Sequence, residues 1–311
     1  MKETRIVFFG TPEFALETLD SLHKSFLVAA VVTQPDRPGG RGKKMLPPPV
    51  KLRAQALGIA LLQPTKIRTA DFVTWLQSMA PDFLVTAAYG KILPSQILAI
   101  PKISALNVHA SLLPRWRGAA PIHRAVLSGD CESGITIIQM DEGMDTGDII
   151  LQDSVPIGQE ETTGDLHAKL ANLGAKLIVE AVTAILAGTA KKVVQDHSLA
   201  TFAPPLTRED EMLDWCAHTS VIHNQVRGMN PWPGAYTWFK GERLKIWAGR
   251  PVYSTHANCG QVLAVGKEGI FVGTGDGVYC ISRLQPPGKK IMDVADFLRG
   301  TLLTPGTVLG K

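Results

Sequence analysis

Short apolar runs alternate with helical stretches through the first half of the chain, and this alternation restricts its fold more than any other feature. The strand-like runs cover residues 6–9, 27–33, 59–62 and 83–87, and a further run ends at His109. Strands that alternate with helices build a mostly parallel sheet with helices on both faces. We therefore predict a mostly parallel, doubly wound α/β fold for this part of the chain.

The turn after the first strand bears on cofactor binding. Gly10-Thr11-Pro12 predicts a helix with Thr11 as its N-cap and Pro12 at its first position. The turn lacks the Gly-x-Gly-x-x-Gly pattern of dinucleotide sites, and the sequence contains no Gly-Lys-Ser/Thr phosphate loop. We therefore expect neither NAD nor ATP as a cofactor.

The end of the first domain shows an antiparallel pair followed by a long helix. Strand-like runs at residues 135–140 and 149–155 flank a glycine-rich turn, after a helical stretch at residues 119–127. Apolar residues then recur with helical spacing up to Ile185, after Thr162 and Asp165, which resemble a capping box, and before Gly188, which predicts a stop.

A chain of 311 residues exceeds the usual size of one hydrophobic core, so we expect two domains. Residues 1–190 form the predicted catalytic domain, and residues 191–206, which have no clear periodicity, form a linker. Short strand-like runs separated by glycine-rich turns fill residues 207–311 and predict a small β-barrel of the oligonucleotide-binding type. A packing module without a ligand is the alternative for this domain.

Composition places the chain among ordinary globular proteins, with 45% hydrophobic and 19% charged residues. Its four cysteines are dispersed without metal-ligand spacing, so we expect reduced thiols. The apolar run at residues 6–9 is too short for a signal-peptide core, and no later run approaches a membrane span. We expect a cytoplasmic monomer that does not bind membranes.

Polar side chains gather where the predicted central strand ends. Asn107 and His109 lie two residues apart on one face of that strand, at the sheet edge where α/β folds keep their ligand crevice. Asp145, in the later glycine-rich turn, could orient the imidazole. An amide, an imidazole and a carboxylate suit a reaction through a tetrahedral oxyanion. The alternative is that Asn107 and His109 merely close a strand. Tyr89 and Gly90 follow the neighbouring strand and are candidates for the crevice wall, although Tyr89 could equally pack in the core.

The segment from Gln34 to Arg53 is strongly basic, with six Lys or Arg residues against the single acidic Asp36. Its glycines and prolines predict no regular structure up to Pro49. Such a loop could approach a phosphate backbone, or it could be an ordinary solvated loop. The candidate RNA-binding residues are Arg37, Arg41, Lys43 and Lys44.

Longer motifs around these residues resemble the folate-dependent formyltransferases. The similar segments are Asn107–Pro114, Arg115–Pro121 and Asp141–Asp148. Further matches at Gly10–Ala15, Gln34–Pro38 and Asn230–Pro233 extend the resemblance to members of the family that act on tRNA.

The resemblance implies a formyl transfer from 10-formyltetrahydrofolate to the α-amino group of methionyl initiator tRNA, for translation initiation. It implies catalytic roles for Asn107, His109 and Asp145 and a second domain that helps to hold tRNA. It also implies a Rossmann-like first domain and a folate-binding segment that comprises Ser111, Leu112, Leu113 and Pro114, to which we add Tyr89 and Gly90.

Two other functions and a metal site fit the sequence less well. A non-catalytic RNA-binding protein would not need the complete trio of polar residues, and formyl transfer to an amino sugar nucleotide would not need the basic loop. The acidic residues of the segment Asp141–Asp148 do not have the spacing of a calcium loop, so we expect no metal.

Overall fold

The computed structural model describes residues 3–39, 44–252 and 258–310. The chain forms two compact units. The first comprises Met1–Pro121, Glu132–Pro156 and His167–Pro204, and the second comprises Ile122–Cys131, Ile157–Leu166 and Pro205–Lys311. The predicted contiguous domains and linker stay a prediction.

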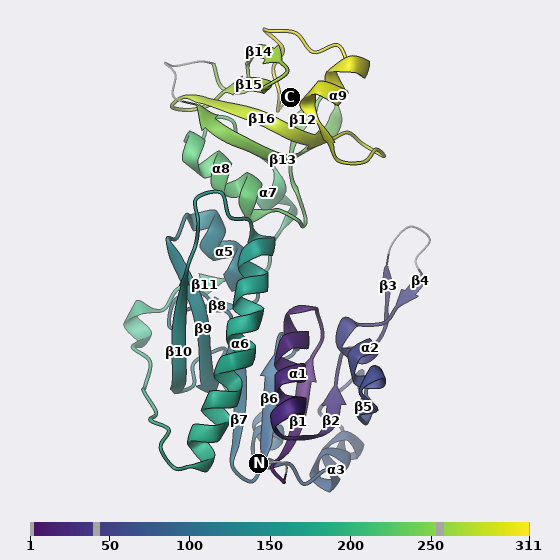
Figure 1. Cartoon of the computed structure of the whole chain (residues 1–311), viewed down its shortest axis with the longest axis vertical. Coiled ribbons are helices and arrows are strands. Elements are labelled where there is room, and N and C mark those ends of the chain that lie inside the picture. Colours follow the sequence, from purple (N-terminus) through teal and green to yellow (C-terminus); the bar gives the residue numbers. More distant parts are fainter. Residues whose placement is uncertain (1–2, 40–43, 253–257, 311) are drawn as a thin grey trace. The chain divides into compact units, whose positions relative to one another are not determined.

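A seven-stranded sheet forms the centre of the first unit, in the order β10-β9-β7-β6-β1-β2-β5 (Figure 1). Its strands are β1 (Arg5–Gly10), β2 (Leu27–Val32), β5 (Leu61–Leu62), β6 (Phe83–Ala87), β7 (Ser104–His109), β9 (Glu132–Gln139) and β10 (Ile149–Pro156). The first five are parallel, whereas β9 runs antiparallel to β7 and β10 antiparallel to β9. The predicted Rossmann-like, mostly parallel sheet is confirmed.

Helices cover both faces of this sheet. The helices of the first unit are α1 (Phe14–Ser25), α2 (Pro49–Ala56), α3 (Ala70–Ser78), α4 (Ser95–Leu98) and most of α6 (Thr163–Leu186). Helix α5 (Pro121–Ser128) belongs almost entirely to the second unit. Val7 and Phe9 of β1 pack with α3 and α4 in one apolar cluster. Figure 1 shows α1 and α6 together against a face of the sheet. Helix α6 approaches β7 so closely that a Cβ at Gly174 would lie 2.8 Å from Val108.

The boundaries of two helices test the sequence reasoning. Helix α1 begins at Phe14 with Glu13 as its N-cap, so the predicted start at Thr11 and Pro12 is wrong. The Thr11 hydroxyl instead donates to the backbone oxygen of Tyr89 at 3.2 Å, because the first turn lies beside the end of β6. The capping box of α6 is confirmed, since Thr162 and Asp165 each accept a hydrogen bond from the backbone N–H of the other.

The glycine- and proline-rich segment contains regular structure, so the expectation of none was wrong. Strand β3 (Arg37–Gly39) pairs antiparallel with β4 (Lys44–Leu46), and α2 begins at Pro49. A two-stranded ribbon tolerates Pro38 because a residue whose N–H would face outward loses no ladder bond. Residues 40–43, between the two strands, lie outside the described part of the chain.

The second unit is built on an antiparallel sheet in the order β12-β13-β16-β15-β14, with β17 paired to β16. These strands are β12 (Ala235–Phe239), β13 (Glu242–Val252), β14 (Val262–Gly266), β15 (Gly269–Gly273), β16 (Val278–Gln285) and β17 (Met292–Asp293), accompanied by helices α7 (Arg208–Glu211), α8 (Thr219–Gly228) and α9 (Val294–Gly300).

The C-terminal residues of the chain link the two outer strands of this sheet. Val262 of β14 donates its N–H to the oxygen of Thr307 at 2.8 Å, and Gly310 donates to the oxygen of Trp238 in β12 at 2.9 Å. Side chains from every long strand point into one apolar cluster that includes Leu244, Ile246 and Tyr279. This small antiparallel unit agrees with the predicted barrel.

The structure also bears on the expectations of reduced thiols and of no membrane-spanning segment. All four cysteines are free thiols. Among the residues that the structure describes, no helix is both long and apolar enough to cross a bilayer.

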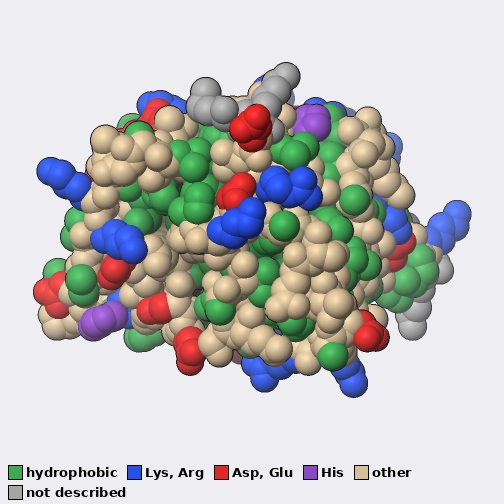
Figure 2. Space-filling model, turned by 90° about the horizontal axis from the view of Figure 1, so that it is seen from below, with side chains coloured by type: hydrophobic (Ala, Val, Ile, Leu, Met, Phe, Trp, Pro, Cys, Tyr) green, Lys and Arg blue, Asp and Glu red, His purple; other side chains and the backbone are tan. Residues whose placement is uncertain are grey.

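The face viewed in Figure 2, from the end at which β1 begins, carries basic and acidic side chains intermixed. The candidate site lies at the opposite, carboxyl ends of the parallel strands.

Candidate active site

The structure brings Asn107, His109 and Asp145 together. The first two lie at the end of β7, and Asp145 comes from the turn between β9 and β10. Asn107 Nδ2 donates to Asp145 Oδ1 at 3.3 Å, and Asn107 Oδ1 accepts a hydrogen bond from the Thr86 hydroxyl at 2.7 Å. The Thr86 bond fixes which end of the amide faces Asp145. The second N–H of Asn107 has no partner among the described residues and is available to a substrate oxygen.

His109 lies between two acceptors. Its Nε2 is 3.0 Å from the backbone oxygen of Trp116, and its Nδ1 is 3.5 Å from Asp145 Oδ1. Only the doubly protonated imidazolium can direct an N–H at both acceptors. The distance from Nδ1 to Asp145 is longer than a typical hydrogen bond, so Nδ1 is the ring nitrogen more easily shared with a third group.

Asp145 is held from several sides in a conformation that is uncommon for a residue with a Cβ. Its φ is +56°, in the left-handed region. The N–H of Gly118 donates to Asp145 Oδ2 at 2.9 Å. Gln195 Nε2 donates to the backbone oxygens of Asp145 at 2.9 Å and of Gly147 at 2.7 Å. The Asp145 side chain is 16% exposed, and the donors from Asn107 and Gly118 replace part of its lost hydration.

A second layer of contacts fixes Gln195 itself. The buried Arg117 guanidinium donates to Gln195 Oε1 from Nη2 at 2.6 Å and from Nε at 3.2 Å. Arg117 begins the short strand β8 (Arg117–Gly118), which pairs in parallel with β11 (Phe202–Ala203). The segment after α6 therefore returns to the site and supports Asp145.

The predicted folate-binding segment directly follows β7. The hydroxyl of the fully buried Ser111 donates to the backbone oxygen of Arg115 at 2.6 Å. Leu113 is also buried, and its N–H donates to the Thr136 hydroxyl of β9 at 3.1 Å. Leu112 and Pro114 are half-buried. Within the protein, Ser111 and Leu113 hold the shape of this turn against β9.

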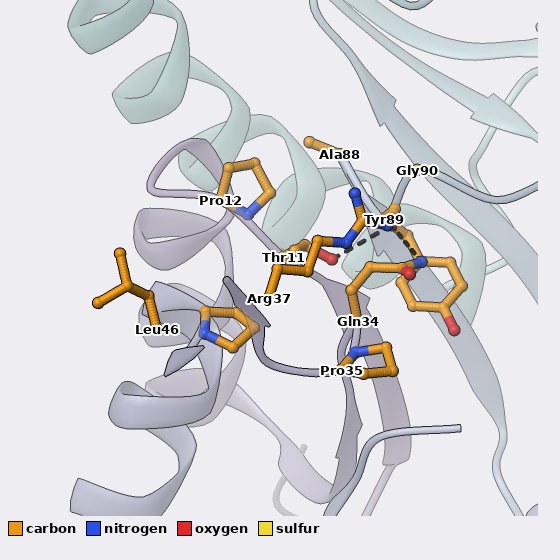
Figure 3. A pocket seen from close by; sticks show the side chains of 10 residues that line it. Thr11, Pro12, Gln34, Pro35, Arg37, Leu46, Ala88, Tyr89 and Gly90 are labelled. Atoms are coloured by element: carbon orange, nitrogen blue, oxygen red, sulfur yellow. Dashed lines mark hydrogen bonds between the residues drawn. The ribbon is translucent and has the colours of Figure 1, made fainter. Parts of the chain in front are cut away.

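Tyr89 and Gly90 (Figure 3) follow the carboxyl end of β6, the strand next to β7. Tyr89 is buried and packs edge-on against Phe9, with ring centroids 5.2 Å apart. Gly90 has a φ of +81°, and a Cβ there would meet no atom within 4 Å. The backbone of Gly90 therefore borders open space that a flat ligand could approach.

The basic segment divides into paired and unpaired cations. Lys51 forms an ion pair with Asp36 at 2.8 Å, and Arg53 forms one with Asp20 at 2.7 Å. Arg37 and Lys44 are exposed on the β3–β4 hairpin, with no ion pair among the described residues. Arg41 and Lys43 were also predicted to bind RNA, but they lie outside the described residues.

Sequence reasoning missed Thr86, Gln195 and the structural roles of Arg117 and Gly118. The last two belong to the motif Arg115–Pro121, so the motif was a signal without an assigned role. Thr86 could have been found, because a polar residue near the end of a buried strand needs a partner. Gln195 gave no signal, since it stands in a stretch without periodicity.

Comparison with known proteins decides the family. A model of the formyl transferase family matches residues 4–182, and a model of the formyl transferase C-terminal domain matches residues 205–302. The chain belongs to the formyl transferase family. No group of three or more His, Cys, Asp or Glu side chains that could hold a metal is present in the described part of this family member.

Relatives within the formyl transferase family match nearly the whole chain. The methionyl-tRNA formyltransferase of Pelotomaculum thermopropionicum is 50% identical, covering 99% of each chain. That of Bacillus subtilis is 47% identical, covering 99% of this chain and 98% of its own.

Solved structures share the fold at low identity. An N-formyltransferase from Helicobacter canadensis, solved with folinic acid and dTDP-3-aminofucose, has a TM-score of 0.65 and 19% identity over 91% of this chain and 100% of its own. HypX from Aquifex aeolicus in complex with tetrahydrofolic acid has a TM-score of 0.63 and 16% identity over 95% of this chain and 47% of its own.

The contacts of Gln195 predict that it positions Asp145. Gln195→Glu keeps the acceptor for Arg117 but turns a second oxygen toward the Asp145 and Gly147 carbonyls. We expect kcat to fall by roughly tenfold to a hundredfold through misplacement of the carboxylate. In an Asp145→Asn background the same change should cost little more, as expected for a residue that acts through Asp145.

The matched control is Gln225→Glu, because Gln225 Nε2 also donates to two backbone oxygens, those of Asp210 and Met212, in the second unit. It should leave kcat near wild type. Losses from Gln195→Glu and Asp145→Asn that simply add in free energy would contradict the positioning role.

Proposed function

We propose that this chain transfers the formyl group of 10-formyltetrahydrofolate to the α-amino group of methionyl initiator tRNA, giving N-formylmethionyl-tRNA for translation initiation. The observation that carries this conclusion is the match of both units, over 99% of the chain, to a methionyl-tRNA formyltransferase at 50% identity. The clustered amide, imidazole and carboxylate supply the groups that such an acyl transfer needs.

The reaction centre is the cluster at the end of β7. The amine nitrogen of the acceptor attacks the formyl carbon, and the C=O electron pair moves to oxygen. The second N–H of Asn107 and the Nδ1–H of His109 donate to this oxyanion. The Asp145 carboxylate, 3.5 Å from Nδ1, orients the imidazole and assists removal of the amine proton. Collapse of the intermediate restores the C=O bond and breaks the bond from the formyl carbon to the folate nitrogen, which leaves with the proton that the amine has lost.

The residues next to the cluster leave room for the flat ring of folate. Folate supplies an activated formyl group on nitrogen. Its proposed contacts are the turn at residues 111–114 and the backbone at Tyr89 and Gly90. The open space beside Gly90 allows a ring to lie against the peptide. Ser111 and Leu113 act by holding the turn, since the Ser111 hydroxyl and the Leu113 N–H are already bonded within the protein.

The proposed RNA contacts are in the basic segment and comprise Arg37, Arg41, Lys43 and Lys44. Domain 207–311 supplies the remaining grip. On the β12–β13 face of that domain, the Arg243 guanidinium lies 4.7 Å from the Tyr236 ring and 5.6 Å from the Trp238 ring. Interleaved cations and aromatic rings are a common surface for nucleic acid.

An acceptor competition tests the proposed function. Purified protein with 10-formyltetrahydrofolate should formylate methionyl initiator tRNA with a much higher kcat/KM than elongator methionyl-tRNA. It should leave a dTDP-amino sugar unmodified. Preference for the amino sugar would contradict the proposal, and a lack of formyl transfer to any acceptor would favour a non-catalytic RNA-binding protein.

The assigned chemistry predicts a rate effect at Asn107. Asn107→Ala removes one oxyanion donor, which typically costs ~2.7–4 kcal/mol of barrier, so kcat should fall about a hundredfold or more. Folate and tRNA affinity, measured by equilibrium binding, should change little. Near wild-type turnover at saturating substrates would rule out this role for Asn107.

The charge of the hairpin predicts a salt effect. Neutralising Lys43 and Lys44 together should lower the log–log salt slope of tRNA binding by roughly 0.7–0.9 for each phosphate that the variant no longer neutralises. Arg41→Ala should lower kcat/KM for methionyl-tRNA without changing folate affinity. Lys176→Ala, at an exposed lysine of α6 paired with Glu180, is the control and should leave the slope unchanged. An unchanged slope in the hairpin variant would return this segment to an ordinary solvated loop.

A further inference from the structure

Two of the four cysteines lie next to each other in the second unit, although they stand far apart in the sequence. Cys216 belongs to the turn that precedes α8, and Cys259 belongs to the turn that precedes β14. The two thiols share a hydrogen bond, which is the main reason that the pKa of Cys216 is raised. Cys216 is exposed and Cys259 is half-buried, so solvent reaches the pair from the Cys216 side.

The backbone brings the two turns together, because both bind the end of β15 and the residues that follow it. Gly260 donates its N–H to the Gly273 oxygen at 2.9 Å, and Gly275 donates its N–H to the Ala217 oxygen at 3.0 Å. The chain approaches so closely at Gly275 that a Cβ there would lie 2.2 Å from the backbone oxygen of Cys216. The backbone therefore imposes the proximity of the two cysteines.

A contact in the apolar core fixes the same two turns. The Trp215 ring is buried in this core, and its Nε1 donates to the Thr237 hydroxyl of β12 at 2.9 Å. A Cβ at Gly260 would lie 3.4 Å from Cδ1 of the Trp215 ring. Trp215 and Gly260 are the direct sequence neighbours of the two cysteines, so the thiols stand beside a rigid contact.

Neighbouring thiols can hold a metal ion or form a disulfide. Among the residues that the structure describes, no group of three or more His, Cys, Asp or Glu side chains could hold a metal. A disulfide needs only the two sulfur atoms. In reducing compartments such bonds are usually transient and serve redox sensing, and a sensing thiol often stands beside a second thiol that resolves it.

We propose that Cys216 and Cys259 form a reversible redox site, which a low-molecular-weight disulfide such as oxidised glutathione converts into an intramolecular disulfide. The exposed Cys216 thiolate attacks one sulfur of the oxidant, forms a mixed disulfide and expels one glutathione thiolate. The Cys259 thiolate then attacks the Cys216 sulfur and expels the second. The protein loses two electrons and two protons, and one glutathione disulfide is reduced to two thiols. The site is independent of the formyl transfer proposed above.

The disulfide stabilises the closure of the sheet in the second unit. Leu309 donates its N–H to the Gly260 oxygen at 2.8 Å, so the turn that carries Cys259 also holds the C-terminal segment. The bond closes the loop from residue 216 to residue 259 and lowers the entropy of the unfolded chain. Because the thiols are already adjacent in the reduced protein, oxidation raises the thermal stability without a change of fold.

Equilibration of the reduced full chain with oxidised glutathione tests the site. After the remaining thiols are blocked with N-ethylmaleimide, peptide mapping by mass spectrometry should identify the Cys216–Cys259 disulfide as the main product. Dithiothreitol should reverse it. The oxidised protein should unfold at a temperature roughly 5 °C or more above that of the reduced protein, as expected for a disulfide that closes a long loop.

Single serine variants separate the two thiols. Cys259→Ser removes the resolving thiol, so glutathione should remain attached to Cys216. Cys216→Ser removes the exposed thiol, so the half-buried Cys259 should react much more slowly. Neither variant should gain stability on oxidation. Cys131→Ser is the matched control, because Cys131 is also an exposed thiol of the second unit, and this variant should still form the disulfide.

Several outcomes would overturn the proposal. They are a persistent glutathione adduct on Cys216 of the wild type, a disulfide that joins two chains, modification of Cys131 while Cys216 and Cys259 stay reduced, or an internal disulfide that lowers the unfolding temperature. All four are read from the wild-type protein, so they decide the matter even where a serine variant fails to fold.

Discussion

Asp145 is held in place by donors from three separate parts of the chain, and the site depends on the position of its carboxylate. Asn107 approaches it from β7, the Gly118 N–H from β8, and Gln195 holds its backbone from the segment after α6. A largely desolvated charge is stable only where such donors surround it. The segment after α6 therefore contributes to the site, because without Gln195 the left-handed turn at Asp145 would lose its support.

How far the sequence predicts this arrangement depends on the range of each interaction. The parallel strands are predictable because each is a continuous apolar run, and the side of the sheet that carries Asn107 and His109 follows from their place at a strand end. Gln195 is not predictable in this way. It lies in a segment whose sheet pairing is confined to the two residues of β8 and a single bridge from Val193 to Ile149, too short for any periodicity. The partners of Gln195 are 48 to 78 residues away in sequence.

The hairpin and the barrel show two other limits of sequence patterns. Proline and glycine argue against regular structure in a central strand, but an isolated two-stranded ribbon has an outward edge on each strand, so Arg37–Gly39 can pair despite Pro38. In the second unit, the short strands indicate a barrel, whereas its closure uses the last residues of the chain. These residues include Gly306 and Gly310, which have positive φ values that strand residues do not adopt. No strand-like sequence pattern therefore marks this segment.

The two tasks of the site therefore fall on elements of different stability. The groups proposed to meet the reacting atoms stand on β7 and its neighbours, whose backbone hydrogen bonds are buried within a seven-stranded sheet. The hairpin, in contrast, is only two strands of three residues, and it joins the sheet through the Asp36 contacts with Lys51 and Gln63. A two-stranded ribbon is marginal by itself, so the proposed RNA contact can reshape it at small cost. Because the Asp36 contacts fix its root, such adaptation need not disturb Asn107, His109 or Asp145.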